Sequence, residues 1–184
     1  MKRLLLWWGL LACLTGLRAA EPATHIDDPG RLLPVDSAWA KELDAKLDAF
    51  ERTAGVKVLV RIHLKSPAAE EDKEPGAYMR GLATKLGVIR HGVLMVYFAD
   101  DPDWRIWMGD ELTERFAGKA GTVKELTDSG AMHEAKEAFL KTAFAKADAS
   151  FAARPKGAPA QHLALQADTL ADGLITKLVP GMPR

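Results

Sequence analysis

Apolar side chains recur every three or four residues in four segments of the chain. The first covers residues 39–54 and is followed by Gly55, a residue type that commonly ends helices. The other three segments cover residues 75–87, 132–151 and 163–178. This spacing places the apolar side chains on one side of a helix. The sequence therefore predicts four amphipathic helices that pack against a core.

Three shorter segments have the hydrophobic pattern of β-strands. In the segment 56–65 the apolar residues Val56, Val58, Val60, Ile62 and Leu64 alternate with the polar residues Lys57, Arg61, His63 and Lys65, which predicts a strand with one solvent-exposed face. Residues 93–99 are apolar throughout, which predicts a central strand that is covered on both faces. The turn-forming residues 100–103 separate this segment from the β-favouring residues 104–108. The last two segments therefore predict a β-hairpin.

The remaining stretches complete the expected order of elements. Residues 21–35 are rich in Pro and Asp and predict an extended segment, and apolar positions around Phe116 and Leu126 predict two short helices. Helices and strands therefore alternate along the chain, which favours a layered α/β domain. We expect this domain to occupy residues 21–152, and a linker with a C-terminal helix, residues 153–184, to pack on it.

The first twenty residues differ in character from the rest of the chain. Lys2 and Arg3 precede an apolar run of 14 residues, Leu4–Leu17, and small residues follow it. The run is shorter than the stretch of about 20 residues that a membrane-spanning helix needs. This pattern predicts a secretory signal peptide over residues 1–20, which is removed from the mature protein.

Two alternatives to a cleaved leader stay open. Residues 10–13 resemble a bacterial lipobox, in which Cys13 becomes a lipidated N-terminus, although residues 14–17 continue the apolar run where a polar tether is usual. The second alternative is a short buried helix. The neighbouring residues Trp7 and Trp8, close to two cations, suit a membrane better than a protein core.

The charge balance narrows the classes of function. The chain has 25 Lys and Arg against 25 Asp and Glu, so it has no basic excess with which to bind nucleic acid. Removal of residues 1–20 takes away Lys2, Arg3 and Arg18 and no acid, which leaves a net charge of −3. It also removes Cys13, the one cysteine of the chain. A disulfide framework and a cysteine-rich zinc site are therefore excluded, and the composition fits an oxidising compartment outside the cytoplasm.

The hairpin turn carries closely spaced acidic residues. Asp100, Asp101 and Asp103 follow the central strand, at the position where ligands of α/β sheets tend to bind. Their carboxylate oxygens suit a hard cation such as Ca²⁺ or Mg²⁺. The alternative is a plain solvated turn, which these residue types also favour. An aspartyl-phosphate nucleophile is disfavoured, because Trp104 and Arg105 follow where a small residue is expected.

Other polar and aromatic residues give weaker signals. The five histidines are scattered without the spacing of a zinc site, and we expect His63 and His133 to be surface residues. The chain has no Gly-x-Ser-x-Gly motif, so a serine hydrolase triad has no visible nucleophile. Among the tryptophans, we expect Trp39 in the core, whereas Trp107, between Ile106 and Met108, is the candidate for an exposed position; an exposed tryptophan patch would mark a binding surface.

Three parts of the chain match, in order and spacing, the motifs of a known family. Residues 26–33 (IDDPGRLL) match its opening Val-Asp-Asp-x-Gly-x-Leu segment, and residues 43–64 match its leucine-rich helix, Glu-x-Thr-x-Gly turn and first strand. Residues 92–96 and 105–112 match its Gly-Val-Leu strand and the strand that ends in Gly-x-Glu-Leu. Over residues 26–150 the chain therefore resembles the TPM domain, the fold of the thylakoid photosystem II repair factor and its bacterial relatives.

The resemblance implies a fold and a candidate site. TPM domains are three-layer α/β/α domains, in which helices flank a small mixed sheet, and they are usually exported and often tethered to a membrane. In such a fold the N-terminal segment packs alongside the hairpin. Asp27 and Asp28 would then join Asp100, Asp101 and Asp103 as ligands of Ca²⁺ or Mg²⁺.

Two functions follow as hypotheses. The export signal and the resemblance imply a non-enzymatic binding module, periplasmic or secreted, that serves the assembly or maintenance of an envelope or membrane complex. A membrane tether would run through the leader or Cys13. The alternative is a divalent-metal-dependent acid phosphatase, an activity that the resemblance implies because plant members of the family show it. The acidic hairpin is the local feature that supports this alternative.

Overall fold

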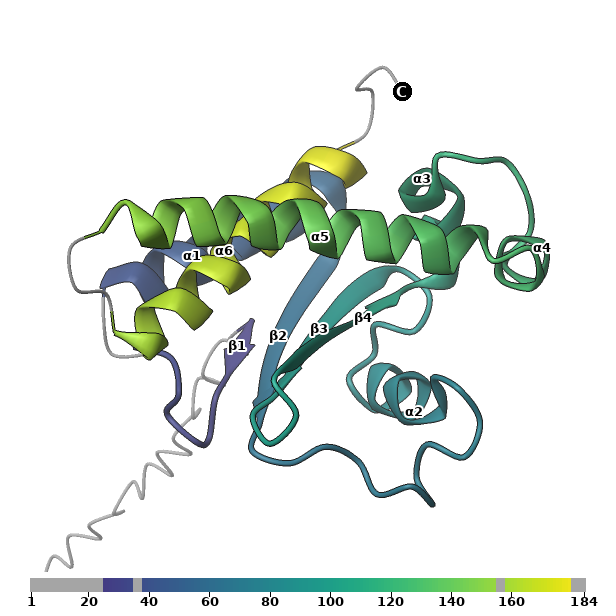
Figure 1. Cartoon of the computed structure of the whole chain (residues 1–184). Helices are drawn as coiled ribbons and strands as arrows, with labels where there is room; N and C mark the ends of the chain where they lie inside the picture. Colours follow the sequence, from purple (N-terminus) through teal and green to yellow (C-terminus); the bar gives the residue numbers. More distant parts are fainter. Residues whose placement is uncertain (1–24, 35–37, 155–157, 180–184) are drawn as a thin grey trace, which may run out of the picture.

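A mixed sheet of four strands forms the centre of the fold (Figure 1). The computed structural model describes residues 25–34, 38–154 and 158–179. The strands are β1 (Ile26–Asp27), β2 (Lys57–His63), β3 (Gly92–Phe98) and β4 (Asp103–Met108). They lie in the order β1-β2-β3-β4. The first three run parallel and β4 pairs antiparallel with β3.

Helices account for most of the remaining described residues. They are α1 (Ala38–Ala54), α2 (Ala77–Lys85), α3 (Thr113–Ala117), α4 (Val123–Asp128), α5 (Ala131–Ala152) and α6 (Pro159–Leu178). A 3₁₀ turn over Asp110–Leu112 connects β4 to α3. The short helix α4 begins with a capping box, in which Thr122 and Glu125 satisfy each other's main-chain N–H groups.

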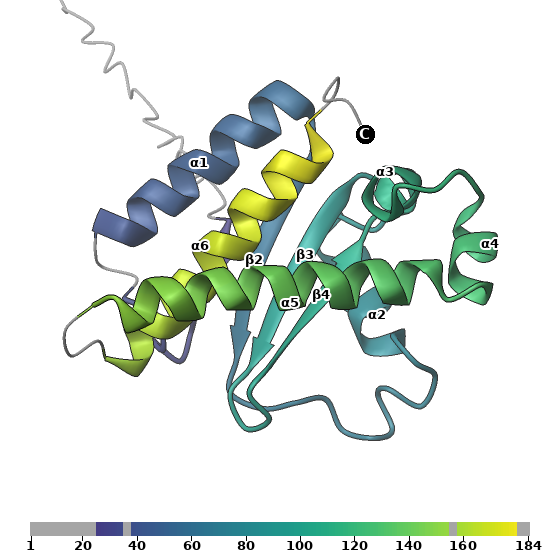
Figure 2. The same ribbon diagram turned by 45° about the horizontal axis from the view of Figure 1, so that its top comes forward.

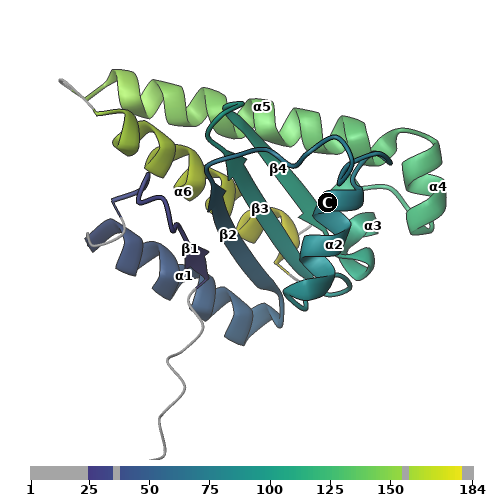
Figure 3. The same cartoon turned by 90° about the horizontal axis from the view of Figure 1, so that it is seen from below.

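The two faces of the sheet are covered unequally. Figure 2 shows α1, α6 and α5 side by side over one face, where their apolar side chains and those of the strands form the larger core cluster. On the other face α2 packs against β3 and β4 and forms a smaller cluster. Figure 3 shows α2 on the β4 side of the sheet, with β1 and β2 farther from it.

The alternation of side chains along β2 explains the two clusters. Successive residues of a strand point to opposite faces of the sheet. Val58, Val60 and Ile62 accordingly belong to the larger cluster, whereas Leu59 belongs to the smaller one. The strand positions of Arg61 and His63 share the face of Leu59, so the polar residues of β2 lie on the α2 side.

Helix α6 is an integral part of the larger core. Leu170 and Leu174 are fully buried there. In addition, the ammonium group of Lys46 on α1 donates hydrogen bonds to Asp168 at 2.6 Å and Asp172 at 2.7 Å on α6. The C-terminal helix and the first helix are therefore joined both by apolar packing and by charge.

The structure confirms the α/β fold class, with a mixed sheet flanked by helices. It also departs from the sequence-based expectation at two places. The extended N-terminal segment contains a short strand, β1, which pairs parallel with β2. Leu64 was expected as the last inward-facing position of the alternating segment, but it follows the end of β2 and its side chain is exposed.

Some expectations concern parts of the chain that the structure does not describe. The predicted signal peptide and Cys13 lie outside the described residues, as does the middle of the predicted linker, residues 155–157. Among the described residues, no helix is both long enough and apolar enough to cross a membrane.

Candidate functional site

A cleft of about 580 Å³ lies on the α2 side of the sheet, at the carboxyl ends of β1 and β2. Asp27, Arg61 and His63 line it from the strands, and Tyr78 and Lys85 line it from α2. We call it the strand-end cleft. Ligands of α/β proteins commonly bind at this end of the strands, so its side chains are the first candidates for a functional site.

His63 and Tyr78 are the two aromatic residues that line the strand-end cleft. The Tyr78 hydroxyl lies 2.9 Å from Nδ1 of His63. Both rings pack on Phe98, with centroids 5.7 Å from it for His63 and 6.0 Å for Tyr78. The three aromatic rings hold the end of β2, the start of α2 and the end of β3 together.

Burial sets the protonation of this pair. Burial lowers the pKa of His63, Asp27 raises it and Arg61 lowers it, with a net decrease. The pKa of Tyr78 is raised, because the hydroxyl is partly buried and lies near Glu71. The imidazole is therefore neutral and the phenol protonated at pH 7. A neutral imidazole with its proton on Nε2 accepts the Tyr78 hydrogen at Nδ1.

Arg61 is the most buried charged side chain of the strand-end cleft, with 11% of its side chain exposed. Its Nη1 donates to the carbonyl oxygens of His25 at 3.0 Å and Val60 at 2.8 Å. Its Nε lies 3.9 Å from a carboxylate oxygen of Asp27, which is mostly exposed. Burial lowers the pKa of Arg61, but a guanidinium group stays charged. The cleft thus contains a fixed cation beside a solvated carboxylate.

Arg105 organises the neighbouring part of the same face. Its Nη1 donates to Asp72 at 3.0 Å, and its Nε lies 3.7 Å from Asp103. The guanidinium group also lies over the ring of Phe98, 4.9 Å from the ring centroid. These contacts fix the loop that precedes α2 against β4.

The structure separates the five predicted metal ligands. Asp100 and Asp101 lie in the β3–β4 turn, where Asp100 accepts hydrogen bonds from the main-chain N–H and the hydroxyl of Ser66 at 2.7 and 2.9 Å. Asp103 begins β4 and lies close to Arg105. These three residues are neighbours in the chain and in space, with two of the carboxylates already in contact with protein donors.

Asp27 and Asp28 lie on the other side of β2, since β1 pairs with β2 and β2 pairs with β3. Asp28 is buried and its Oδ2 accepts a hydrogen bond from the main-chain N–H of Leu33 at 2.6 Å, which closes the loop after β1. Asp27 faces the strand-end cleft. Within the described part of the chain, no group of three or more His, Cys, Asp or Glu side chains is arranged to hold a metal ion. The five carboxylates therefore do not fit one shared metal centre, and binding of Ca²⁺ or Mg²⁺ stays a prediction.

Sequence reasoning missed the roles of two histidines. His63 was expected on the surface, but it is half-buried and bonded to Tyr78. His25 is buried, with Nε2 2.9 Å from a carboxylate oxygen of Glu51 and its main-chain N–H donating to Asp44. A signal for His25 was present in the sequence, because Asp44 and Glu51 are seven residues apart and therefore share one side of α1.

The tryptophans lie partly as expected. Trp39 is half-buried and packs against the larger core cluster. Trp104 is buried, and its Nε1 donates to Gln166 on α6 at 3.1 Å. Trp107 is half-buried, and the guanidinium group of Arg80 lies over its ring. The hairpin therefore presents one partly covered indole on its α2 side.

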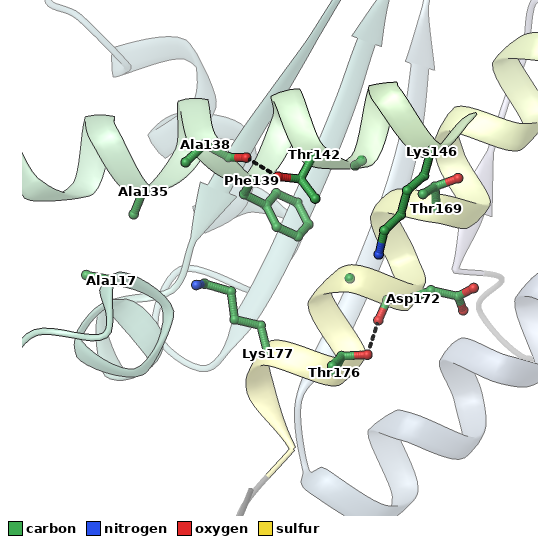
Figure 4. Close-up of a pocket in the computed structure, with 12 residues that line it drawn as sticks. Ala117, Ala135, Ala138, Phe139, Thr142, Lys146, Thr169, Asp172, Thr176 and Lys177 are labelled. Carbon is green, nitrogen blue, oxygen red and sulfur yellow. Dashed lines mark hydrogen bonds between the residues drawn. The ribbon is translucent and has the colours of Figure 1, made fainter. Parts of the chain in front are cut away.

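A second hollow, of about 680 Å³, lies between α5 and α6 (Figure 4). Phe139 projects into it, and a Cβ atom at Gly173 would lie only 2.7 Å from the ring, so glycine is what lets the ring approach α6. The Thr142 and Thr176 hydroxyls at its walls donate to main-chain carbonyls of their own helices. Thr169 likewise donates to a carbonyl of its own helix, and the rest of the lining combines alkyl and aromatic groups with the charged side chains of Lys146, Asp172 and Lys177.

Comparison of the chain with protein-family models and with curated proteins found no match.

Proposed function

We propose that this chain is an exported, non-enzymatic binding module of the TPM type, periplasmic or secreted, which serves the assembly or maintenance of an envelope or membrane complex. Three observations support the proposal. The N-terminal pattern is typical of a signal peptide. The motifs over residues 26–150 resemble the TPM domain. The strand-end cleft presents polar side chains that are already fixed in place.

The last observation carries most weight. Arg61 is held by two carbonyl oxygens, and His63 is held by the Tyr78 hydroxyl and by packing on Phe98. Side chains that are ordered before a partner arrives lose little conformational entropy on binding. Such a rigid, mixed-charge surface at the end of the strands suits recognition of another protein.

Charge reversal at the rim of the strand-end cleft tests the proposal. Lys85 and Asp27 are exposed there, so Lys85→Glu and Asp27→Lys reverse the charge of the rim without removing a buried apolar side chain, and circular dichroism of the double variant checks that it stays folded with a cation beside Arg61. Lys41→Glu on the exposed side of α1 is the matched control. We expect the mature protein to bind detergent-solubilised envelope proteins from its own cells saturably, with affinity lost in the double variant and kept in the control. Equal binding by all three proteins, or no binding, would contradict the proposal.

An enzyme assay tests the alternative function. The mature protein is incubated with p-nitrophenyl phosphate in the presence of Ca²⁺, Mg²⁺ or EDTA, beside the variant Asp101→Ala. We expect no turnover above the buffer rate under any of these conditions. Turnover that requires the cation and disappears in Asp101→Ala would contradict the binding module and favour a metal-dependent phosphatase.

The exported location is tested at the N-terminus. We expect mass spectrometry of the protein from its own cells to find a mature chain that begins near residue 21, in the fraction outside the cytoplasm. A mature chain that begins at a lipidated Cys13 would agree with export and would show that the protein is anchored to a membrane. An intact N-terminus in the cytoplasmic fraction would contradict export.

A further inference from the structure

Strand β4 forms one edge of the sheet, because it pairs with β3 alone among the described strands. The main-chain N–H of Gly109 donates to the carbonyl of Gly92 at 2.8 Å, just beyond the end of the β3–β4 pair. Hydrogen-bonded pairs alternate with non-bonded pairs along an antiparallel ladder. The register therefore turns the N–H and C=O groups of Arg105 and Trp107 towards β3, and those of Ile106 and Met108 away from it.

A groove of about 480 Å³ follows this free edge. Every residue of β4 from Asp103 to Met108 lines it. Successive side chains of a strand point to opposite faces, so a hollow that touches all six residues runs along the edge of the strand. Met79 and Arg80 of α2 form one wall, and Lys136 and Leu140 of α5 form part of the other. Figure 1 shows β4 between these two helices. We call this hollow the edge groove.

Two polar groups in the edge groove lack partners. The Nε1 atom of Trp107 is buried and has no hydrogen-bond acceptor in the described structure. Lys136 is half-buried, and its ammonium group has no hydrogen-bond or ion-pair partner among the described residues. Burial lowers the pKa of Lys136, as expected for a cation that has lost water without gaining an anion. A buried donor without an acceptor costs free energy that a ligand can recover.

The charges around the edge groove define what the ligand must carry. Arg105 is already paired with acidic side chains, and Arg80 lies over the Trp107 ring. Glu137 and Asp110 at the rim are exposed and keep their water. The half-buried Lys136 is thus the cation of the edge groove that lacks an anionic partner among the described residues, so a complementary ligand carries a carboxylate. The free N–H and C=O groups of β4 and the Trp107 indole require main-chain carbonyls and amides as well.

We propose that an extended peptide segment of a partner protein, with an acidic side chain that pairs with Lys136, adds to β4 as a fifth strand. Strand addition to a free sheet edge is a general mode of peptide recognition, in which the main chain supplies affinity and side-chain pockets supply specificity. The six residues of β4 span about 20 Å, so they pair with a segment of similar length. This inference rests on the proposed binding function and adds a second binding surface to the strand-end cleft, together with the kind of partner segment that this second surface takes.

Hydrogen exchange with a defined probe tests the proposal. Ten-residue peptides are selected from a random displayed library against the mature protein, and the tightest binder is used as the probe. With the probe at saturation, we expect the exchange rates of the Ile106 and Met108 amide hydrogens to fall by about tenfold or more, because these amides become hydrogen-bonded. The exchange rates of the Arg105 and Trp107 amide hydrogens should stay unchanged. N-methylation of the probe at successive residues should abolish binding at alternate positions only, since a strand pairs through every second residue.

Matched variants test the counter-charge. We expect Lys136→Met, which keeps the approximate length of the side chain, to lower the affinity for the probe by about tenfold or more, because a charge-assisted hydrogen bond is lost. Lys141→Met, at an exposed position of the same helix, should leave the affinity unchanged. The selected probes should share an acidic residue, and its replacement by Asn or Gln should have no further effect in Lys136→Met.

Several results would overturn strand addition. The peptide selection could yield no binders, or binders that share no acidic residue. Hydrogen exchange could show no slowing at the Ile106 and Met108 amides. N-methylation could weaken binding equally at successive positions of the probe. Sedimentation that shows a dimer with the same amides protected would instead assign the edge groove to a second copy of this chain.

If the edge groove fails these tests while the strand-end cleft still binds envelope proteins, the proposed function stands without strand addition. If the edge groove binds the probe while envelope binding is absent, the failure is in the proposed function.

Discussion

The hydroxyl of Tyr78 lies 2.9 Å from Nδ1 of His63. This contact joins α2 to the end of β2, on the face of the sheet where α2 is the covering helix in the described structure. The imidazole also packs edge-on against Phe98 at the end of β3. The side of the molecule with less apolar packing is therefore held in part by one polar contact between aromatic residues.

Removal of the Tyr78 hydroxyl should weaken this attachment. We expect Tyr78→Phe to lower the free energy of unfolding by about 1 kcal/mol, the usual net value of one hydrogen bond with a neutral partner. Tyr97→Phe is the matched control, because the Tyr97 ring packs on Trp104 and its hydroxyl has no described hydrogen bond. Urea denaturation of the two variants and the wild type measures the difference. Equal losses in both variants would mean that the His63 contact contributes nothing specific.

The lowered pKa of His63 predicts a pH dependence of stability. Burial makes the folded state bind a proton at this ring less readily than the unfolded state, whose histidine titrates near about 6.5. The unfolded state therefore binds more protons as the pH falls through that value, and the folded state loses stability. We expect the wild type to lose more stability than His63→Gln between pH 7.5 and 5.5, measured by urea denaturation at each pH. His133→Gln, at an exposed position, should follow the wild type, and identical curves for all three would contradict the prediction.

The fold was predictable because its elements are long and their hydrophobic period is regular. The all-apolar segment 93–99 predicted a strand buried on both faces, and Val93 to Val96 are indeed fully buried. Leu170 and Leu174 stood at helical spacing and are buried in α6. The strand β1 was not predicted, because a strand of two residues is too short to show an alternating hydrophobic pattern. Its position depends on partners distant in sequence, such as the main-chain hydrogen bond from Val60 to the carbonyl of His25.

The candidate site was less predictable, because it depends on which strands are neighbours. The acidic turn at Asp100 and the segment at Asp27 both carried carboxylates, but the sequence did not show that β2 lies between them. His63 appeared as a polar residue on an alternating strand. Its partner Tyr78 lies 15 residues away on a helix. Trp107 was expected to be exposed, but the cation of Arg80 lies over it from α2, and no local pattern predicts such a contact.

Gly109 ends β4 where no side chain fits. A Cβ atom at this position would lie 2.5 Å from the carbonyl oxygen of Arg90 and 2.8 Å from that of Gly92, both in the main chain. We expect Gly109→Ala to destabilise the protein by about 1–3 kcal/mol, because main-chain atoms cannot move aside as a side chain can. Gly81→Ala is the opposite case, since a Cβ atom there meets nothing within 4 Å in helix α2, and it should stabilise by about 0.5–1 kcal/mol. Thermal denaturation of both variants measures the two signs, and a neutral Gly109→Ala would contradict the close contact.

Helix α6 should unfold together with the sheet. Leu170 is completely buried against the larger core cluster, so we expect Leu170→Ala to lower the free energy of unfolding by about 2–5 kcal/mol. Leu64→Ala removes a side chain that is 55% exposed and should change stability by about 0.5 kcal/mol or less. Circular dichroism and tryptophan fluorescence should report one coincident transition in each protein. A separate early transition of the helices in Leu170→Ala would show that α6 is an appendage to the domain.

Calcium binding at the β3–β4 turn should be weak. A cation at Asp100, Asp101 and Asp103 competes with the Ser66 hydrogen bonds to Asp100 and with Arg105 beside Asp103. Hard cations bind through several carboxylate oxygens at once, and weak extracellular sites have dissociation constants of about 10⁻⁴–10⁻³ M. We expect calorimetric titration with CaCl₂ to give an affinity in this range or weaker, and Asp101→Ala to abolish it. Ser66→Ala removes one of the two hydrogen bonds to Asp100, that of the hydroxyl, and keeps the main-chain N–H donor, so it should strengthen binding modestly if the turn is the site. Micromolar affinity that survives Asp101→Ala would place the cation elsewhere in the chain.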